Sequence, residues 1–451
     1  MTLRSFEKPI IRRPLCCKSN CRAALAAAIF CFATTTQAEI NVYDNDRFKV
    51  FFGLDATTAA FTQNNAWFGQ DVANIGVETD DWIELGIVPK LHFTLDRESG
   101  AQFFGGISAA ATKTFGESAD GLAVGFDDPG AATIEEVYLG WRHNFHGNRS
   151  LEIMGGNINY KIGTGFLIQD GGHDGGDRGG FYISKRQAFH RSGLIRFTNG
   201  NFLVEGFYLG NNPRQGGIEG ELAGVNVEYD FSGRGMIGAT YIDSIEVDDV
   251  LIGPIFEELS IYDVRGEVKA TENLTLSGEY ATQTGGGVFE GKGWWGQASY
   301  SFSNSRGTPS LAYRYAVVTG DDPSTTELEG FAPIAWGFTD HAQWYQGEIT
   351  GDWIFANTNQ RTHLIKVSTS LSEKFRLTGL YLKIEIDEPG ALGITSDDFG
   401  DEYDIYLEWK FNDALFLSAV VAIFDPDDGA TQFTGGDKTW SHLMLYARYS
   451  F

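Results

Sequence analysis

Residues able to do chemistry gather in one glycine-rich stretch of the sequence, between Asn159 and His190. The stretch mixes carboxylates, basic side chains and histidine among many glycines. If it folds into a pore, facing acids and bases would create a transverse field, which orients dipolar solutes and sets ion preference. As a hypothesis, we therefore assign residues 160–188 to a pore constriction that is carried by Lys161, Asp170, His173, Asp174, Asp177, Arg178, Lys185 and Arg186.

Two other interpretations of the same stretch stay open. Carboxylates on a flexible loop suit calcium, so the run from Asp170 to Asp177 could bind that ion. The stretch could also be a solvated external loop. A phosphate-binding loop is excluded, because no Lys-Ser or Lys-Thr pair follows the glycines and no helical pattern opens after them. We expect neither a metal site nor a cofactor.

The sequence contains no recognisable catalytic motif. There is no Gly-x-Ser-x-Gly elbow and no His-Glu-x-x-His pair, and the 8 histidines are scattered along the chain. All 4 cysteines (Cys16, Cys17, Cys21 and Cys31) precede residue 39, so the rest of the chain holds no thiol nucleophile. We therefore do not expect an enzyme.

The first 38 residues are expected to form a secretory signal peptide and not to belong to the fold. A basic leader precedes an apolar core from Ala23 to Ala33, and Thr36-Gln37-Ala38 suits cleavage before Glu39. The whole chain carries 34 basic and 60 acidic residues, which gives a net charge of −26. Cleavage would remove six basic residues and one acidic residue, and the mature chain would carry −31.

Composition narrows the class of protein. Glycine accounts for 56 of 451 residues and aromatic residues for 14%, which is too aromatic for a disordered chain. After the first forty residues, no apolar run approaches the ~18 residues of a membrane helix. The acidic balance excludes a general nucleic-acid binder, which needs a basic face. Such a chain is typical of a β-barrel with an apolar outside and a wet inside.

Alternation with a period of two dominates the chain after residue 39. Apolar and polar positions alternate along residues 83–95, 403–411 and 443–451. Eight short turns alternate with nine long, acidic and glycine-rich connections. The pattern predicts an all-β fold over residues 39–451, a transmembrane antiparallel β-barrel of about 18 strands, with 16 as the alternative. Short turns would be periplasmic and long loops extracellular.

The same alternation assigns residues to the ends and to the inside of the barrel. Aromatic residues at strand ends are expected to form an interfacial girdle: Phe48, Phe145, Phe197, Tyr229, Phe302, Phe375 and Phe411. As a second hypothesis, the basic residues of the lumen wall are Lys90, Arg142, Arg196, Arg265, Arg314, Lys366, Lys383, Lys410 and Arg448. Acidic residues share this face, so charges are expected to pair across neighbouring strands.

The end of the chain, Arg448-Tyr449-Ser450-Phe451, resembles the sorting signal of bacterial outer-membrane barrels, because a strand with apolar alternation ends in phenylalanine. Over residues 39–451 the chain resembles a Gram-negative outer-membrane porin. Residues 156–197 and 319–364 are similar, more narrowly, to barrels of the alginate-export type.

This resemblance implies a water-filled channel in the outer membrane for passive diffusion of ions and small hydrophilic solutes. Export or uptake of an alginate-like polysaccharide is the alternative, and an outer-membrane enzyme or receptor is a third interpretation. The implied partners are outer-membrane lipid and lipopolysaccharide, the solutes themselves and, through Phe451, the barrel-insertion machinery. Nucleic acid is not among them, and a homotrimer is left open by analogy with porins.

Overall fold

The computed structural model describes residues 39–79, 81–98, 100–118, 129–213, 217, 219–248, 256, 258–285, 288–337, 346–355 and 357–451. The chain divides into two units, Met1–Thr35 and Thr36–Phe451, and every described residue belongs to the second. The expected signal peptide, residues 1–38, lies outside the described residues.

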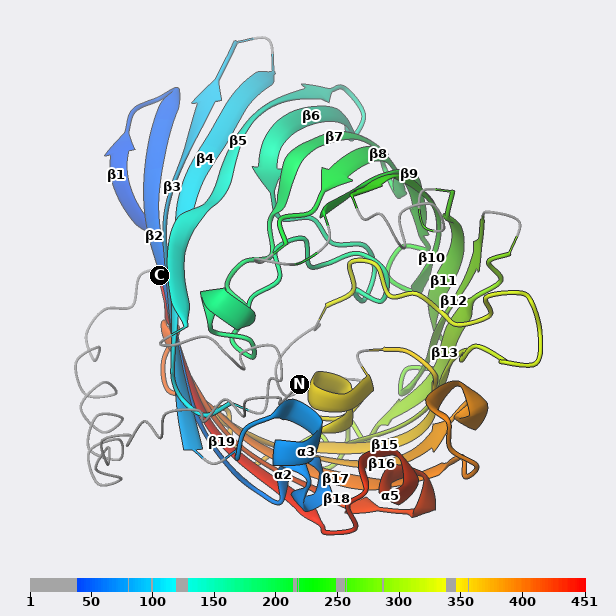
Figure 1. Cartoon of the computed structure of the whole chain (residues 1–451). Coiled ribbons are helices and arrows are strands. Elements are labelled where there is room, and N and C mark those ends of the chain that lie inside the picture. Colours follow the sequence, from blue (N-terminus) through cyan, green and yellow to red (C-terminus); the bar gives the residue numbers. More distant parts are fainter. Residues whose placement is uncertain are drawn as a thin grey trace, which may run out of the picture. The chain divides into compact units, whose positions relative to one another are not determined.

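Eighteen antiparallel strands close into a barrel, and one short strand precedes them (Figure 1). The strands of the first half are β1 (Ile40–Asp44), β2 (Phe48–Asn64), β3 (Asp81–Asp96), β4 (Ala101–Gly116), β5 (Gly130–Phe145), β6 (Arg149–Ile158), β7 (Phe189–Asn199), β8 (Phe202–Gly210), β9 (Glu219–Asp230) and β10 (Gly235–Asp248). Those of the second half are β11 (Ser260–Lys269), β12 (Leu274–Thr284), β13 (Lys292–Ser301), β14 (Ser310–Val318), β15 (Gln360–Ser370), β16 (Phe375–Ile386), β17 (Asp398–Lys410), β18 (Leu415–Pro426) and β19 (Trp440–Ser450). The predicted fold class and the number of 18 strands are confirmed.

The barrel closes where its last strand pairs with β2. The register of β19 on β2 runs from Ser441 opposite Asn64 to Ser450 opposite Asp55. Phe451 continues the seam, since its backbone and that of Leu54 exchange two hydrogen bonds of 2.8 and 3.0 Å. The stagger of the strands leaves the first residues of β2 beyond the end of β19, and β1 pairs with β2 there, with Ile40 opposite Phe52.

Side chains alternate between the two faces of the barrel, as the sequence pattern predicts. On β3, Leu85 and Ile87 lie exposed on the outside, whereas Glu84, which directly precedes Leu85, is fully buried on the inside. The same holds on β17, where Ile405 is exposed and Asp404 is buried. Five residues of the predicted aromatic girdle lie exposed near the short-turn end: Phe145, Phe197, Tyr229, Phe302 and Phe411.

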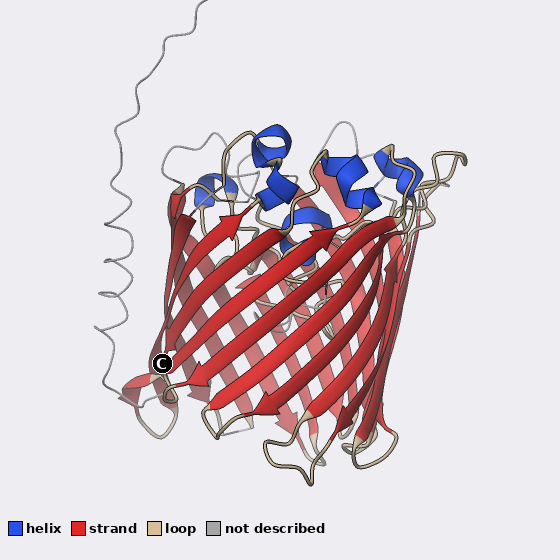
Figure 2. Cartoon of the chain, turned by 90° about the horizontal axis from the view of Figure 1, so that it is seen from below, coloured by secondary structure: helices blue, strands red, loops and turns tan. Residues whose placement is uncertain are grey.

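Connections differ in length at the two ends of the barrel. The end that holds the C-terminus carries the short turns, and the helices lie at the opposite end (Figure 2). The helical segments are α2 (Ala66–Gly69), α3 (Asp71–Ile75), η1 (Gly176–Arg178), η2 (Thr350–Phe355), η3 (Pro389–Leu392) and α5 (Asp428–Thr434). Within the described part of the chain, no helix is long and apolar enough to cross a membrane.

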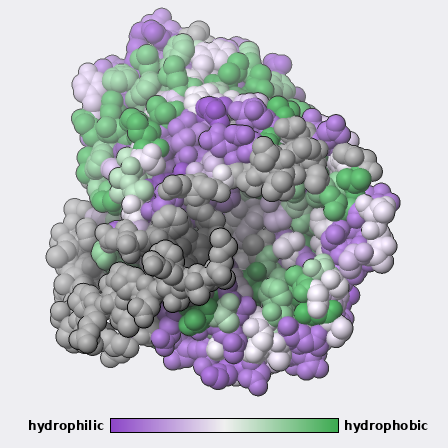
Figure 3. Space-filling model, viewed as in Figure 1, coloured by the Kyte–Doolittle hydropathy of each residue, from purple (hydrophilic) through white to green (hydrophobic). Residues whose placement is uncertain are grey.

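Two apolar clusters form the core, and both lie inside the barrel between its wall and the long connections. One joins inward residues of β15–β19, such as Leu382 and Phe424, to Ile349 and Trp353 near η2. The other joins residues such as Leu194 on β7 and Ile261 on β11 to Phe166 and Phe331 in two connections. Viewed along the barrel, hydrophobic residues also gather on the outer flank of β2–β5, and hydrophilic residues border a central hollow (Figure 3).

Candidate functional site

The connection between β6 and β7, residues 159–188, folds into the barrel and contacts its wall on several sides. Tyr160 donates a hydrogen bond of 3.1 Å to Glu205 on β8, and Thr164 donates one of 3.1 Å to Glu279 on β12. At the other side, the amides of Tyr182 and Ile183 both donate to Glu84 on β3 at 3.0 Å. We call this segment the inner loop; it crosses the interior from β2–β5 to β8–β12.

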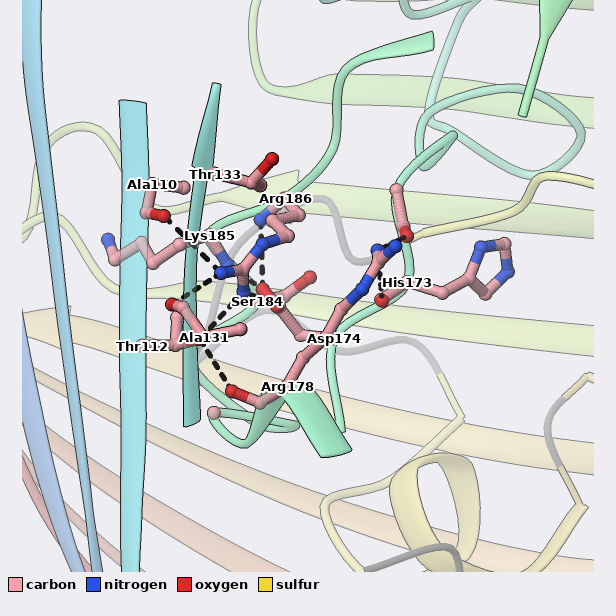
Figure 4. Close-up of polar contacts among 12 residues, drawn as sticks. Ala110, Thr112, Ala131, Thr133, His173, Asp174, Arg178, Ser184, Lys185 and Arg186 are labelled. Atoms are coloured by element: carbon pink, nitrogen blue, oxygen red, sulfur yellow. Dashed lines mark hydrogen bonds and ion pairs between the residues drawn. The ribbon is translucent and has the colours of Figure 1, made fainter. Parts of the chain in front are cut away.

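A buried ion pair holds the inner loop in its fold (Figure 4). Arg186 and Asp174 lie 2.5 Å apart, and the side chains of both are fully buried. The Arg186 guanidinium also donates to the hydroxyl of Thr112 on β4 and to the carbonyl oxygens of Ala110 and Ala131. Burial raises the pKa of Asp174, and the charge of Arg186 opposes this shift. The pair therefore fixes the inner loop to the wall at β4 and β5.

Further contacts along the inner loop satisfy its backbone. Arg178 donates to the carbonyl oxygens of Gly172, His173, Asn212 and Pro213, which joins the loop to the connection after β8. The glycines permit close packing: a Cβ on Gly172 would lie 1.9 Å from the carbonyl oxygen of Arg186. The glycine-rich composition thus serves a tightly folded segment.

The structure separates the eight predicted constriction residues by exposure. Lys161 and His173 are exposed, and Asp170, Asp177, Arg178 and Lys185 are partly buried. Asp174 and Arg186 are buried against the wall, so they position the loop and cannot meet a solute in this conformation. Lys185 reaches Asp55 on β2 at 2.5 Å, and burial lowers the pKa of its ammonium group.

The calcium interpretation of the run from Asp170 to Asp177 finds no support in the geometry. Asp170 accepts the amides of Gly172 and His173 and the hydroxyl of Ser184, and Asp174 is engaged by Arg186. Among the described residues, no group of three or more His, Cys, Asp or Glu side chains could hold a metal ion.

A second segment inside the barrel, residues 346–355 with η2, was missed by sequence reasoning. Glu402 on β17 accepts hydrogen bonds from the amides of Ile349 and Thr350, at 2.5 and 2.9 Å. Glu348 links the two inner segments, because it accepts hydrogen bonds from Tyr182 of the inner loop and from Tyr406 of β17. The only signal was a run of acidic and aromatic residues within a long connection.

Carboxylates gather where these two segments meet the wall. Glu84, Glu348, Asp352, Glu402 and Asp404 are all buried there. Oδ1 of Asp352 has no hydrogen-bond partner in the described structure. Burial, followed by the charges of three neighbouring carboxylates, raises the pKa of Asp352 well above its ordinary value.

Basic and acidic residues of the lumen wall pair across neighbouring strands, as expected. Arg142 on β5 donates to Glu152 on β6 at 2.6 Å, and Arg196 on β7 lies between Glu152 and Glu205, at 3.3 and 2.6 Å. Arg265 on β11 continues the pattern with Glu228 and Asp263. These pairs give one sector of the wall many charged side chains but a net charge close to zero.

Other predicted wall residues also lie on the inner face. Arg314 and Lys366 join Arg265 in lining a cavity of about 450 Å³, which we call the inner chamber. Lys90 lies 3.7 Å from Glu39, and Arg448 stacks over Phe416. Lys410 lies at the short-turn end, paired with Asp413.

The lumen assignment of Lys383 does not agree with the structure. On β16 the buried, inward positions are Leu380, Leu382, Ile384 and Ile386, so Lys383 faces outward. There it pairs with acidic residues near the long-loop rim, including Asp427 at 2.8 Å. The inner face of β16 packs against the segment around η2, and its inward residues are therefore apolar. A strand that faced a water-filled lumen would carry polar residues at these positions.

The fold is shared with solved outer-membrane channels. The chain is similar to OpdQ of Pseudomonas aeruginosa, with 14% identity and a TM-score of 0.57 over 90% of this chain and 99% of that one. It is also similar to a BenF-like porin from Pseudomonas fluorescens Pf-5, with 13% identity and a TM-score of 0.57 over 90% and 98%. For Pseudomonas aeruginosa OpdK with vanillate, the identity is 11%, and the TM-score is 0.57 over 90% and 98%.

No protein-family model matches the sequence, and no curated protein matches it either. The likeness to these structures shows a porin fold. It does not extend to the alginate-export type, so the narrower resemblance of residues 156–197 and 319–364 is not supported.

Proposed function

We propose that the chain is a porin of the Gram-negative outer membrane, which lets ions and small hydrophilic solutes diffuse passively through a water-filled barrel. The observation that carries this proposal is a closed barrel with an apolar outside, a charged inner wall and a connection folded into its interior. Eighteen strands enclose more space than wall side chains fill, and here two inserted segments reduce it.

Within this proposal, the inner loop is the constriction. Lys161 and His173 are its exposed charged or titratable side chains, and Asp177 and Arg178 lie partly exposed beside them. Asp174 and Arg186 do not line the constriction; they hold the inner loop in place through their buried ion pair. Below the loop, solutes would meet Arg265, Arg314 and Lys366 of the inner chamber.

The proposed partners follow from the two ends and the outside of the barrel. The outward apolar residues would meet lipid, and the long-loop rim would face lipopolysaccharide. Phe451, at the seam with β2, would present the terminal signal to the insertion machinery. A homotrimer is the proposed assembly by analogy with porins alone.

Single-channel conductance in planar bilayers tests the function. We expect ohmic current in KCl, and the absence of current from correctly folded protein would refute the proposal. The site is tested by Lys161→Glu, which should shift the reversal potential in a salt gradient toward cation preference. The matched control is Lys410→Glu, which makes the same charge change at the short-turn end, away from the inner loop, and should shift the reversal potential less.

A further inference from the structure

A second cavity lies at the long-loop end of the barrel, apart from the inner chamber. Its volume is about 580 Å³, and we call it the mouth chamber. Its wall side is formed at the long-loop ends of β7–β10 by Phe189, Leu209, Leu222 and Ser244. Its other side is the arch of residues 328–335, in the connection after β14.

The arch is held in place by hydrogen bonds to the inner loop and to β12. Ala335 pairs with Ile168 of the inner loop, and its carbonyl oxygen accepts the amides of Gln169 and Asp170 at 2.7 and 2.9 Å. Ala332 exchanges hydrogen bonds of 2.7 and 2.8 Å with the side chain of Gln283 on β12. The mouth chamber therefore has two ordered walls. Gly163 and Thr164 of the inner loop line the inner chamber, and Ile168 of the same loop pairs with Ala335, which lines the mouth chamber.

The lining of the mouth chamber suits an aromatic ring. Phe189, Phe289 and Phe331 contribute to it, together with Leu209 and Leu328. Phe331 is held in place by stacking on Phe166, with ring centroids 5.5 Å apart. Pockets of a few hundred Å³ with apolar walls and few polar groups are the usual sites for small molecules, and aromatic faces also attract cations.

The charged residues in the described lining of the mouth chamber are acidic. No lysine or arginine belongs to the described lining, whereas Asp321 and Glu221 do. Asp321 accepts the amide of Glu329 with one oxygen, and Glu221 is already engaged by Arg191 and Tyr208. Partial burial and the nearby charges of Asp387, Asp322 and Glu329 raise the pKa of Glu388 on the adjacent connection, which indicates a concentrated negative potential at this rim.

The two chambers therefore differ in the sign of their net formal charge. In the lining of the inner chamber, Arg265, Arg314 and Lys366 outnumber Glu267 and Glu279, whereas the charged residues in the described lining of the mouth chamber are Asp321 and Glu221. We propose that the mouth chamber binds solutes that combine an aromatic ring with a positive charge. This inference names a solute class for the channel, and so it rests on the proposed function.

Ligand binding in nanodiscs tests the inference without requiring conduction. Saturation-transfer NMR would compare benzylamine with benzoate, which has the ring and the opposite charge, and with butylamine, which has the charge and no ring. Benzylamine is expected to bind about tenfold more tightly than either. Equal binding of benzoate, or of butylamine, would overturn the inference.

Two variants locate the binding. Asp321→Asn keeps the acceptor for Glu329 and removes the charge, and it should weaken benzylamine about threefold. Asp322→Asn, at a neighbouring acid outside the described lining, is the control for a general loss of charge and should weaken binding less than Asp321→Asn does. Leu222→Trp should fill the chamber and abolish binding in a barrel that still folds. Equal effects of the two Asp variants, or full binding by Leu222→Trp, would refute the site.

The same preparations separate this inference from the proposed function. If the barrel conducts KCl but does not prefer benzylamine, the chamber proposal fails and the porin remains. If it prefers benzylamine but never conducts, the chamber stands as a binding site and the porin fails.

Discussion

The Arg186–Asp174 pair should determine whether the inner loop stays in place, and Arg186→Met tests this directly. The substitution keeps the apolar stem of the side chain but removes four hydrogen bonds, one of them to a fully buried carboxylate. Removal of one partner from a buried ion pair costs about 3–5 kcal/mol, because the other charge stays buried without compensation. At 1.4 kcal/mol per factor of ten, the opening of the loop should become about 10²- to 10⁴-fold more frequent.

Amide hydrogen exchange by mass spectrometry measures this opening. The amides of Lys185 and Arg186 donate to Asp174, and those of Gln187 and Ala188 donate to Glu135, so exchange of this stretch should accelerate by the stated factor. The barrel strands should not change, and single-channel current should become larger and noisier. Arg191→Ala, which removes an exposed arginine from the rim, is the control.

A double variant separates lost contacts from the unpaired charge. Arg186→Met combined with Asp174→Asn removes the carboxylate that Arg186→Met alone leaves without its ion-pair partner, so exchange should slow by about tenfold or more relative to Arg186→Met alone. If Arg186→Met changes exchange by less than about tenfold and leaves the conductance unaltered, the pair does not hold the loop and the reasoning is wrong.

Three further outcomes are expected. Tyr182→Phe should weaken the link between the inner loop and Glu348 by about 1–2 kcal/mol, which exchange in residues 346–355 will measure, and an unchanged rate would argue against the link. The folded structure raises the pKa of Asp352, so the folded chain binds a proton at this carboxylate more tightly than the unfolded chain does. The segment around η2 should therefore become less stable as the pH rises above about 4, the ordinary pKa of an aspartate. Asp352→Asn should reduce this dependence of exchange protection, because the other buried carboxylates of the cluster remain, and a pH response equal to that of the wild type would contradict the assignment. Deletion of Phe451 should slow barrel assembly, seen as less heat-modifiable protein on gels, whereas Phe433→Ala at an exposed site should not; equal behaviour would exclude a role for the seam contact.

Much of the barrel could be predicted because one local rule governs it. A strand with one face toward lipid and the other toward water must alternate apolar and polar side chains. This rule predicts the number of strands, the turn pattern and the inward positions of Arg142 and Arg196. The rule fails where the inside is no longer wet. Lys383 was misassigned because the inner face of β16 packs on another segment, which the alternation of β16 alone does not reveal.

The site was predictable as a segment but not residue by residue. Glycines and mixed charges indicated that residues 159–188 enter the pore, yet Asp174 and Arg186 became buried partners whereas Lys161 stayed exposed. Which charge pairs with which depends on how the loop crosses the barrel. Glu135 is an example, because it accepts hydrogen bonds from the amides of Gln187 and Ala188 of the inner loop. A bulge between β4 and β5 places Glu135 and its neighbour Glu136 opposite Ser108, whose hydroxyl donates to Glu136.

The order of assembly is constrained by where the inner segments attach. Lys185 bonds to Asp55 on β2, and through Tyr182 and Glu348 the same loop reaches Tyr406 on β17. These attachment points lie on opposite sides of the seam between β2 and β19, and they come together only after the final strands are in place. The inner loop can therefore complete its docking only when β2 and β17 are both in place, and once docked it connects the two sides of the seam between β2 and β19.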